Sequence, residues 1–223
     1  KVIKIANNEI ISIGRIYSHI TWFLGFIPNS DEGKIEALAA YGNKNNELYE
    51  YLMRSTSINN LNEIVIDKSV MEYLVKNLNN LKIKLGDKNI AAATQGYLED
   101  FIVEYVKKII STYQIYDIAL SGGTFANVKL NMSIFERTGV KNIFIIPAMS
   151  DSGAGLGALL LKLKEEKKIT YDYLKNKKFV MPYWGPKYSS TEIMKDIESF
   201  SSKINFNVIK NGNWIDEVAK LIS

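Results

Sequence analysis

The sequence predicts an α/β fold, because one segment alternates short apolar strands, glycine-containing turns and helices. A strand at 115–120 runs into a turn at 121–123, and a helix follows over about 125–137. A second strand at 142–146 leads to a small-residue turn at 150–155 that opens another helix. Parallel strands with such crossovers bring both turns to one sheet edge, where open α/β folds bind ligands.

The composition is that of an ordinary globular chain. Of the 223 residues, 47% are hydrophobic and 23% are charged, so we expect a sizeable core rather than a disordered, coiled-coil or collagenous chain. No apolar run approaches the roughly 18 residues of a membrane span, and no charged-then-apolar secretory leader is visible. We therefore expect no membrane partner and a cytoplasmic location.

Cysteine is absent, and His19 is the single histidine. This excludes a disulfide framework, a thiolate nucleophile, a cysteine-based zinc site and a multi-histidine metal site within the chain. His19 itself is interpreted as a packed or surface histidine rather than as a ligand or base. The net charge is +4, but the lysines are spread out and not gathered with aromatic residues, so we expect no nucleic-acid partner.

The first third of the chain predicts a hairpin followed by helices. Apolar segments at 2–5 and 10–13 flank an Asn-Asn pair, which favours a β-hairpin. Helical spacing follows over 17–24, up to a glycine, and a second short helix is expected over 32–40. Residues 44–86 are predicted to be helical, with breaks at the two Asn-Asn pairs that they contain.

The most regular helix is predicted to be capped by Asp87 and to run to Tyr113. Its apolar side chains recur at helical spacing, at Ile90, Ala93, Tyr97, Phe101, Tyr105 and Ile109. Near the end of the chain, residues 190–223 predict a helix, a strand at 206–209 and the start of another helix.

The turn Ser121-Gly122-Gly123 is the first candidate site. Backbone N–H groups at a helix start suit a phosphate or another anion, and glycine lets the backbone come close to it. The alternative is a tight turn that needs small residues for packing; no Gly-Lys-Ser/Thr follows, so it is not a Walker A loop. Asn127 and Asn131, four residues apart on the next helix, could bond a sugar or a nucleophile. The alternative is that they are solvent-exposed or locally capping asparagines.

The second turn contains Asp151, which could cap the following helix or bind a divalent metal. Gly153, Gly155 and Gly157 would weaken that helix, so we expect a neighbouring helix or a ligand to approach its backbone closely. A third candidate is Lys34, because the helix dipole disfavours a lysine at a helix start. It could contact an anionic substrate or be an ordinary solvated side chain.

Six motifs, taken in their order along the chain, resemble one family. They are Ile13-Gly14 with Tyr17, Thr21 and Leu24-Gly25-Phe26; Glu32-Gly33-Lys34 with Ala37-Leu38-Ala39-Ala40-Tyr41-Gly42; Asn89-Ile90-Ala91-Ala92-Ala93 with Gln95 and Leu98-Glu99; Leu120-Ser121-Gly122-Gly123 with Asn127 and Asn131; Pro147-Ala148 with Asp151, Gly153 and Gly157-Ala158; and Trp184-Gly185-Pro186 with Tyr188-Ser189. This order is similar to that of the O-carbamoyltransferases of nodulation-factor and antibiotic biosynthesis.

The resemblance implies an actin-like, ribonuclease-H-like ATPase fold, shared with sugar kinases, heat-shock ATPases and the tRNA threonylcarbamoyl-transferring proteins. Residues 1–180 would form the second half of that domain, and 181–223 a linker and the start of a C-terminal YrdC-like domain. The family makes carbamoyl-adenylate from carbamoyl phosphate and ATP, then transfers the carbamoyl group to a hydroxyl of a small-molecule or sugar acceptor. A homodimer is a further expectation.

The motif matches also assign residues. By resemblance, Asp151 would ligate a divalent metal, Fe or Mg, and Lys34 and Asn127 are the catalytic candidates. The residues expected to bind ATP or carbamoyl-adenylate are Gly33, Ser121, Gly122, Gly123, Asn127, Asn131 and Gly153.

Some positions depart from the family pattern. The glycine turn continues Thr124-Phe125-Ala126 where Val-Ala-Leu is usual, and Ser150 replaces a glycine. The family's metal-binding histidines and arginine-rich adenylating motif would lie before Lys1 and after Ser223, so we expect this chain alone to be catalytically incomplete. Two alternatives stay open: a kinase of the same fold, against which the Ala-Ala-Tyr-Gly and Trp-Gly-Pro segments argue, and a non-catalytic nucleotide-binding relative.

Overall fold

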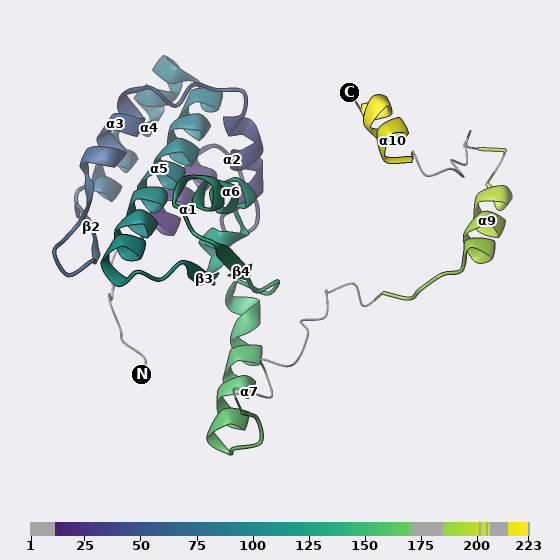
Figure 1. The fold of residues 1–223 in the computed structure, drawn as a ribbon. Coiled ribbons are helices and arrows are strands. Elements are labelled where there is room, and N and C mark those ends of the chain that lie inside the picture. The colour runs from purple at the N-terminus through teal and green to yellow at the C-terminus, as the bar shows by residue number, and fades with distance from the viewer. Residues whose placement is uncertain (1–11, 171–184, 201, 204, 206–213, 223) are drawn as a thin grey trace. The chain divides into compact units, whose positions relative to one another are not determined.

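The computed structural model divides the chain into two units, Lys1–Lys175 and Asn176–Ser223 (Figure 1). The residues that it describes are 12–170, 185–200, 202, 203, 205 and 214–222. Over these residues the α/β class is confirmed in a largely helical form, with two two-stranded sheets. None of the helices described is both long and apolar enough to cross a bilayer.

The first unit contains most of the described elements. Its helices are α1 (Ile13–Phe23), α2 (Glu32–Ala39), α3 (Glu47–Arg54), α4 (Val70–Leu85), α5 (Asp87–Tyr113), α6 (Val128–Arg137) and α7 (Ala154–Glu165). Its strands are β1 (Thr56–Ile58), β2 (Ile64–Ile66), β3 (Asp117–Leu120) and β4 (Asn142–Ile145), and two short 3-10 turns are η1 (Gly123–Ala126) and η2 (Asp151–Gly153). The second unit contributes α9 (Ser190–Ser199) and α10 (Trp214–Ile222).

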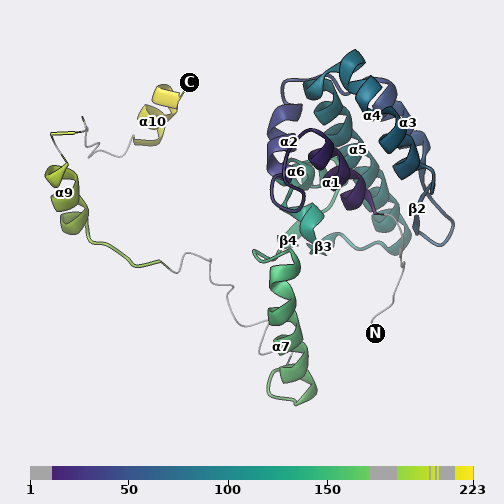
Figure 2. The same cartoon turned by 180° about the vertical axis from the view of Figure 1, so that it is seen from behind.

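Helix α5 is the centre of the first unit. Every residue from Ile90 to Glu99 is buried, as expected of a helix that neighbours cover on all sides. Helices α1, α2, α3, α4 and α6 all contact it, and both views show it running through the middle of this unit (Figures 1 and 2). The predicted end at Tyr113 is confirmed, and Gln114 after it has a left-handed backbone. The predicted cap is wrong by one residue: Gly86 is the N-cap, with no side-chain capping bond, and Asp87 is the first residue of the helix.

The predicted strand–turn–helix–strand unit is also confirmed. Strands β3 and β4 pair in parallel, in a register that places Asp117 opposite Asn142 and Leu120 opposite Ile145. Helix α6 is the crossover between them. The turns that follow the two strands meet, because the N–H of Gly122 donates to the carbonyl oxygen of Met149 at 2.7 Å.

The segment 44–86 differs from the prediction. Between α3 and α4 the chain forms an antiparallel hairpin, β1–β2, in place of a simple helix break. The Asn59 side chain builds its turn by accepting from the N–H groups of Leu61 and Glu63, both at 2.9 Å. The break predicted at 79–80 is wrong: both asparagines lie inside α4 and are exposed, so their amides face solvent and need not interrupt the backbone.

The first helix begins earlier than expected. Ile13, predicted to end a strand, is the first residue of α1, because the Ser12 hydroxyl accepts from the N–H of Arg15 at 3.2 Å and caps the helix. The rest of the predicted hairpin at 2–13 lies outside the described residues, as does the strand predicted at 206–209.

Candidate functional site

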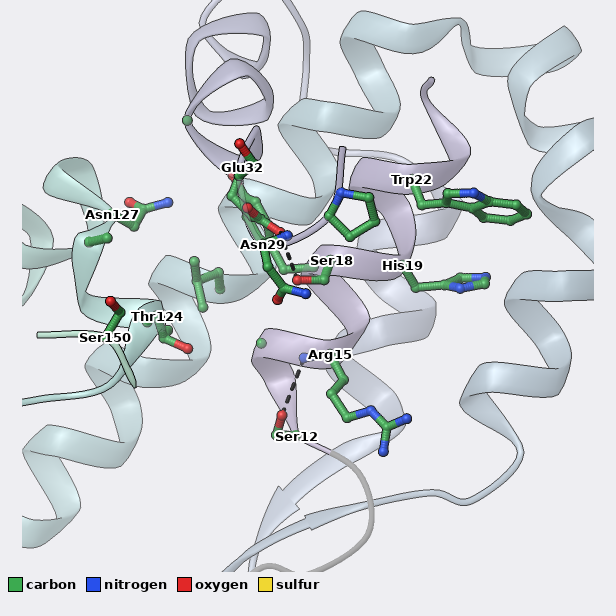
Figure 3. A pocket seen from close by; sticks show the side chains of 18 of the residues that line it. Ser12, Arg15, Ser18, His19, Trp22, Asn29, Glu32, Thr124, Asn127 and Ser150 are labelled. Atoms are coloured by element: carbon green, nitrogen blue, oxygen red, sulfur yellow. Dashed lines mark hydrogen bonds between the residues drawn. The ribbon is translucent and has the colours of Figure 1, made fainter. Parts of the chain in front are cut away.

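A cavity of about 990 Å³ lies in the first unit (Figure 3). Its walls come from α1, the loop from α1 to α2, the first turns of α2, the η1 turn and the pair Ser150–Asp151. Among the sequence-predicted site residues, it brings together Gly33, Gly123, Asn127 and Asp151. Segments far apart in the chain therefore meet at the edge of the parallel β3–β4 pair.

The other predicted site residues do not line this cavity; they are Lys34, Ser121, Gly122, Asn131 and Gly153. The Lys34 side chain is 58% exposed and pairs with Asp31 at 2.9 Å, with its ammonium 5.7 Å from the ring centre of Phe26. That pairing lowers the pKa of Asp31, together with a backbone hydrogen bond from Ile27. The structure thus accounts for Lys34 at this helix start without a ligand.

The glycine turn has the geometry of a close-approach site. Gly122 has a φ of 112°, which strains any residue with a side chain. A Cβ added at Gly123 would meet nothing within 4 Å, so the backbone there is open. Within the described part of the chain, no hydrogen bond from the N–H of Gly123 or Thr124 to a protein acceptor is found. These two donors can therefore serve a ligand.

Asn127 has the local capping role that was the alternative to ligand binding. It precedes α6 as the N-cap, and its Oδ1 accepts from the N–H of Leu130 at 2.8 Å. Its amide also pairs with Gln95 through two hydrogen bonds, of 2.8 and 3.1 Å. Asn131 donates to the carbonyl oxygen of Phe125 at 2.8 Å. The Oδ1 of Asn131 is buried without a hydrogen-bond partner among the described residues, but Asn131 does not line the cavity.

In the second turn a close approach is found at one of the three glycines, but it is made neither by a neighbouring helix nor by a ligand. A Cβ on Gly153 would lie 2.0 Å from the carbonyl oxygen of Ala148, so the close approach is made by the protein's own backbone. At Gly155 and Gly157 an added Cβ would meet nothing within 4 Å, so the described residues make no such approach there. Asp151 is exposed, is the first residue of η2 and lines the cavity, while the residue before α7 is Gly153, so Asp151 is not the cap of that helix.

We tested whether these residues fit the divalent metal that the resemblance implies. Within the described residues, no group of three or more His, Cys, Asp or Glu side chains could hold a metal ion. Around Asp151 the neighbouring oxygen groups are the hydroxyls of Ser150 and Ser152, 3.0 Å apart. The described part of the chain does not by itself fit a complete metal centre.

Sequence reasoning missed two carboxylates in the cavity wall. Glu32 accepts from the Ser18 hydroxyl at 2.8 Å and from the N–H of Asn29 at 2.7 Å. Glu36 accepts from the N–H of Lys129 at 2.8 Å and so joins α2 to the start of α6. Their spacing of four residues on a predicted helix was the signal that could have found them.

Tyr17 lies between these carboxylates and the core. Its hydroxyl donates to Oε1 of Gln95 at 2.9 Å, and its side chain is 4% exposed. Burial raises the pKa of Tyr17, and the nearby charges of Glu36 and Glu32 raise it further, so the phenol stays protonated. On the same helix, His19 lines the cavity beside Trp22, with ring centres 5.7 Å apart, and partial burial lowers the pKa of the imidazole.

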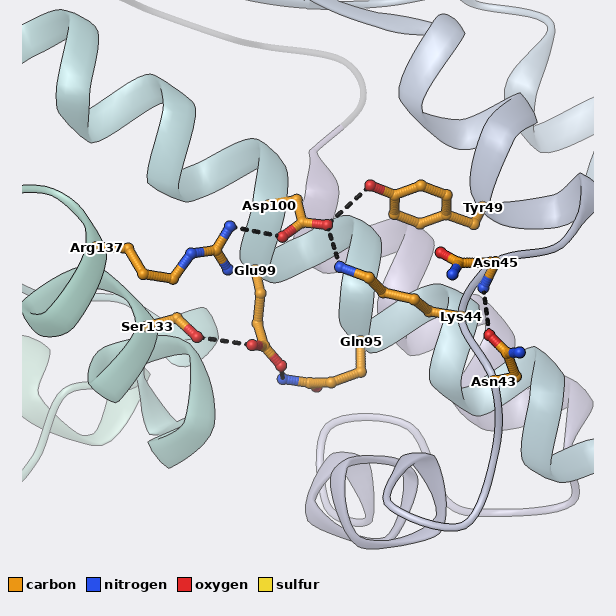
Figure 4. A network of polar contacts seen from close by, with 9 residues as sticks. All are labelled: Asn43, Lys44, Asn45, Tyr49, Gln95, Glu99, Asp100, Ser133 and Arg137. Carbon is orange, nitrogen blue, oxygen red and sulfur yellow. Dashed lines mark hydrogen bonds and ion pairs between the residues drawn. The ribbon is translucent and has the colours of Figure 1, made fainter.

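An ion-pair cluster around Asp100 joins α5 to its neighbours (Figure 4). The Asp100 carboxylate accepts from Lys44 at 2.5 Å, from the Tyr49 hydroxyl at 2.8 Å and from Arg137 at 2.8 Å. The Lys44 chain reaches it by crossing Gly96, where an added Cβ would lie 2.5 Å from Lys44 Cδ. Burial would raise the pKa of Asp100, but the three hydrogen bonds outweigh it and lower this pKa.

We expect Asp100→Asn to lower the free energy of unfolding by about 1–2 kcal/mol at pH 7, a value reduced because both basic partners are 42% exposed. The folded pKa lies below the unfolded value, so the stabilisation is complete above about pH 4 and is lost as the pH falls through the folded pKa. Urea unfolding at pH 7 and below pH 4 measures both effects.

The control is Glu72→Gln, which breaks a pair with Lys76 whose partners are 66% and 68% exposed. It should change the free energy of unfolding by no more than about 0.5 kcal/mol. An Asp100→Asn variant as stable as this control, or one whose deficit grows on acidification, would contradict the assignment.

The geometry defines an α/β unit with a cavity whose wall includes a glycine turn. Residues 2–160 match the family model of the carbamoyltransferase N-terminus, and the chain belongs to this family. The recognition made from the motifs is therefore confirmed.

Three relatives show the extent of the match. The Methanocaldococcus jannaschii protein MJ1058 is 41% identical over 95% of this chain and 35% of its own length. A second protein of that organism, MJ1051, is 30% identical over 90% of this chain and 38% of its own length. Nodulation protein NolNO of Sinorhizobium fredii is 24% identical over 80% of this chain and 26% of its own length. The chain thus spans about a third of the length of the curated relatives it matches.

Proposed function

We propose that this chain is part of the carbamoyl-transferring domain of a cytoplasmic O-carbamoyltransferase. Residues 1–180 belong in this proposal to an actin-like domain, and 181–223 lead into a YrdC-like domain. The whole protein makes carbamoyl-adenylate from carbamoyl phosphate and ATP and passes the carbamoyl group to a hydroxyl of a small-molecule or sugar acceptor. Family membership and the name of the nodulation relative support this proposal.

One observation carries the assignment to this cavity. Gly33 of the Glu-Gly-Lys motif, Gly123 of the glycine turn and Asp151 of the second turn line the same space, although they come from distant parts of the sequence. A cavity of about 990 Å³ is large enough for a nucleotide together with part of an acceptor. The unpaired donors of Gly123 and Thr124 offer a place for its phosphate.

The transfer reaction requires the protein to position the acceptor hydroxyl against the carbamoyl carbon and to accept the hydroxyl proton. The acceptor oxygen bonds to the carbamoyl carbon, the bond from that carbon to the phosphate oxygen breaks, and AMP leaves with the electron pair. The hydroxyl proton must leave at the same time, and the carboxylates of Glu32 and Glu36 in the cavity wall can accept it. Asp151 remains a candidate metal ligand, and no step here relies on a metal.

Gly123→Ala should weaken AMP binding by about tenfold or more without lowering the melting temperature. The added Cβ meets no protein atom, so only a ligand that approaches the turn closely would meet it. Calorimetric titration of the full-length protein with AMP measures the affinity. Gly155→Ala is the matched control, since it adds the same methyl group to open space outside the cavity lining. Equal AMP affinity in the two variants would show that the nucleotide does not bind at this turn.

The reaction class is tested by its nucleotide product. Full-length protein given ATP and carbamoyl phosphate should release inorganic phosphate from carbamoyl phosphate and pyrophosphate from ATP as carbamoyl-adenylate forms. AMP should follow when a hydroxyl acceptor, or water in its place, takes the carbamoyl group. ADP as the product would instead indicate a kinase of the same fold, and nucleotide binding without turnover would indicate a non-catalytic relative.

A further inference from the structure

A buried chain of polar side chains runs from α5 to the glycine turn. Gln95 and Glu99 are 2% and 8% exposed. The Gln95 Nε2 donates to Glu99 Oε1 at 2.8 Å, and the Ser133 hydroxyl donates to the other Glu99 oxygen at 2.6 Å (Figure 4). From Gln95 the chain continues to Tyr17 and Asn127, which both line the cavity. The mechanism proposed above uses neither Gln95 nor Glu99.

The direction of these hydrogen bonds is set at both ends. A carboxylate only accepts, so Glu99 draws the Nε2 of Gln95 toward itself. A backbone N–H only donates, so Leu130 draws the Oδ1 of Asn127 toward itself. With these two orientations, the donors and acceptors of the Gln95 and Asn127 amides match each other. The Gln95 oxygen accepts from Asn127 Nδ2 at 2.8 Å, and its nitrogen donates to Asn127 Oδ1 at 3.1 Å.

We propose that Gln95, oriented by Glu99, is a positioning residue for the glycine turn. Asn127 directly follows η1 and precedes α6 as its N-cap, so the orientation of its amide sets how the turn enters the helix. A reversed Gln95 amide would place its oxygen against Glu99 and its nitrogen against the Asn127 nitrogen. The proposal rests on the proposed function only in that this turn binds the nucleotide.

Reversal of the hydrogen-bond direction provides the test. Asn127→Asp keeps the cap on α6, because aspartate is as good an N-cap as asparagine, but it loses the donor to Gln95. Glu99→Gln keeps the shape of the carboxylate and can still accept from Gln95, but it no longer dictates which way the Gln95 amide faces. In the double variant the introduced amide can donate to the oxygen of a reversed Gln95. The Gln95 nitrogen then faces the introduced carboxylate at 127 and the Tyr17 hydroxyl, and both of these groups can accept from it.

The readouts are AMP affinity by calorimetry and amide hydrogen exchange of residues 121–131 without nucleotide, both on the full-length protein. Asn127→Asp should weaken AMP binding about tenfold and speed exchange in the turn, because two hydrogen-bond acceptors then face each other. Glu99→Gln alone should weaken binding only a few-fold. The double variant should recover to within about threefold of the original affinity, which independent roles would not produce.

Thr94→Val is the control for packing on α5, since its buried hydroxyl donates only to the carbonyl oxygen of Ile90 within the helix. It should leave both readouts unchanged. Additive losses in the double variant, or unchanged exchange in Asn127→Asp, would overturn the positioning role. If the unaltered protein binds no AMP, the proposed nucleotide site fails, while the exchange measurement still decides whether Gln95 positions the turn.

Discussion

Gly42→Ala should lower the free energy of unfolding by about 3 kcal/mol. A Cβ at this position would lie 2.1 Å from the carbonyl oxygen of Lys88 and 3.0 Å from the Cβ of Ala92. Both atoms belong to α5, whose next residues are buried on every side, so the helix cannot move away. The loop that follows α2 must therefore detach from the helix, or the helix must distort.

Detachment would break more than one contact. The N–H of Asn43 donates to Oδ1 of Asn89 at 2.8 Å, and the Asn46 amide donates to the carbonyl oxygen of Asn89 at 3.1 Å. The same loop carries Lys44 to Asp100. The Ala-Ala-Tyr-Gly segment that ends α2 thus brings Gly42 into close contact with α5. This contact leaves no room for a side chain at position 42, which is a physical reason for a glycine there.

Gly33→Ala is the matched control for Gly42→Ala. Gly33 lies in α2, an added Cβ there meets nothing within 4 Å, and alanine favours a helix by about 1 kcal/mol over glycine. The two substitutions should therefore change stability in opposite directions, as measured by urea unfolding at neutral pH. A Gly42→Ala protein as stable as the unaltered chain would show that the loop does not dock on α5 in this way.

Gly153→Ala should cost about 2 kcal/mol and also reduce AMP affinity in the proposed site. Its Cβ would lie 2.0 Å from the carbonyl oxygen of Ala148, so the turn 148–153 must open. Opening moves Ser150 and Asp151, which line the cavity. It also strains the bond that the Met149 carbonyl receives from Gly122.

Unfolding and AMP titration of the full-length protein measure the two effects, with Gly157→Ala as the control. Gly157 lies in α7, where an added Cβ meets nothing within 4 Å, so that substitution should stabilise the helix and leave AMP affinity unchanged. Loss of stability without loss of AMP affinity in Gly153→Ala would separate the second turn from the nucleotide site.

The sequence predicted the elements that show a clear helical or strand pattern. The spacing from Ile90 to Ile109 predicted α5, and apolar strands before two glycine turns predicted the parallel β3–β4 pair. The β1–β2 hairpin was missed because each strand has three residues, too few for a period to show. The helix break predicted at Asn79 and Asn80 was wrong because an exposed asparagine is compatible with a helix interior.

The candidate site could be predicted only in part, because some of its contacts join residues that are far apart in the sequence. The glycine turn and Asp151 stand out in the sequence, and the structure places Gly123 and Asp151 at one cavity. The pairing of Tyr17 with Gln95 joins residues 78 positions apart, so no local pattern could reveal it. Gln95 and Glu99 helped to carry the family resemblance, yet their role emerges only from the contacts of three helices.

Helix α5, 27 residues and about 40 Å long, is the common packing partner of the other core helices of the first unit. Because α1, α2 and α6 each contact it, three walls of the cavity share one supporting helix. The loop at Asn29–Ser30 and the turn at Ser150–Asp151 line the cavity outside these helices. We therefore expect a crosslink between that loop and that turn to restrict the shape of the cavity more than a crosslink between α1 and α6.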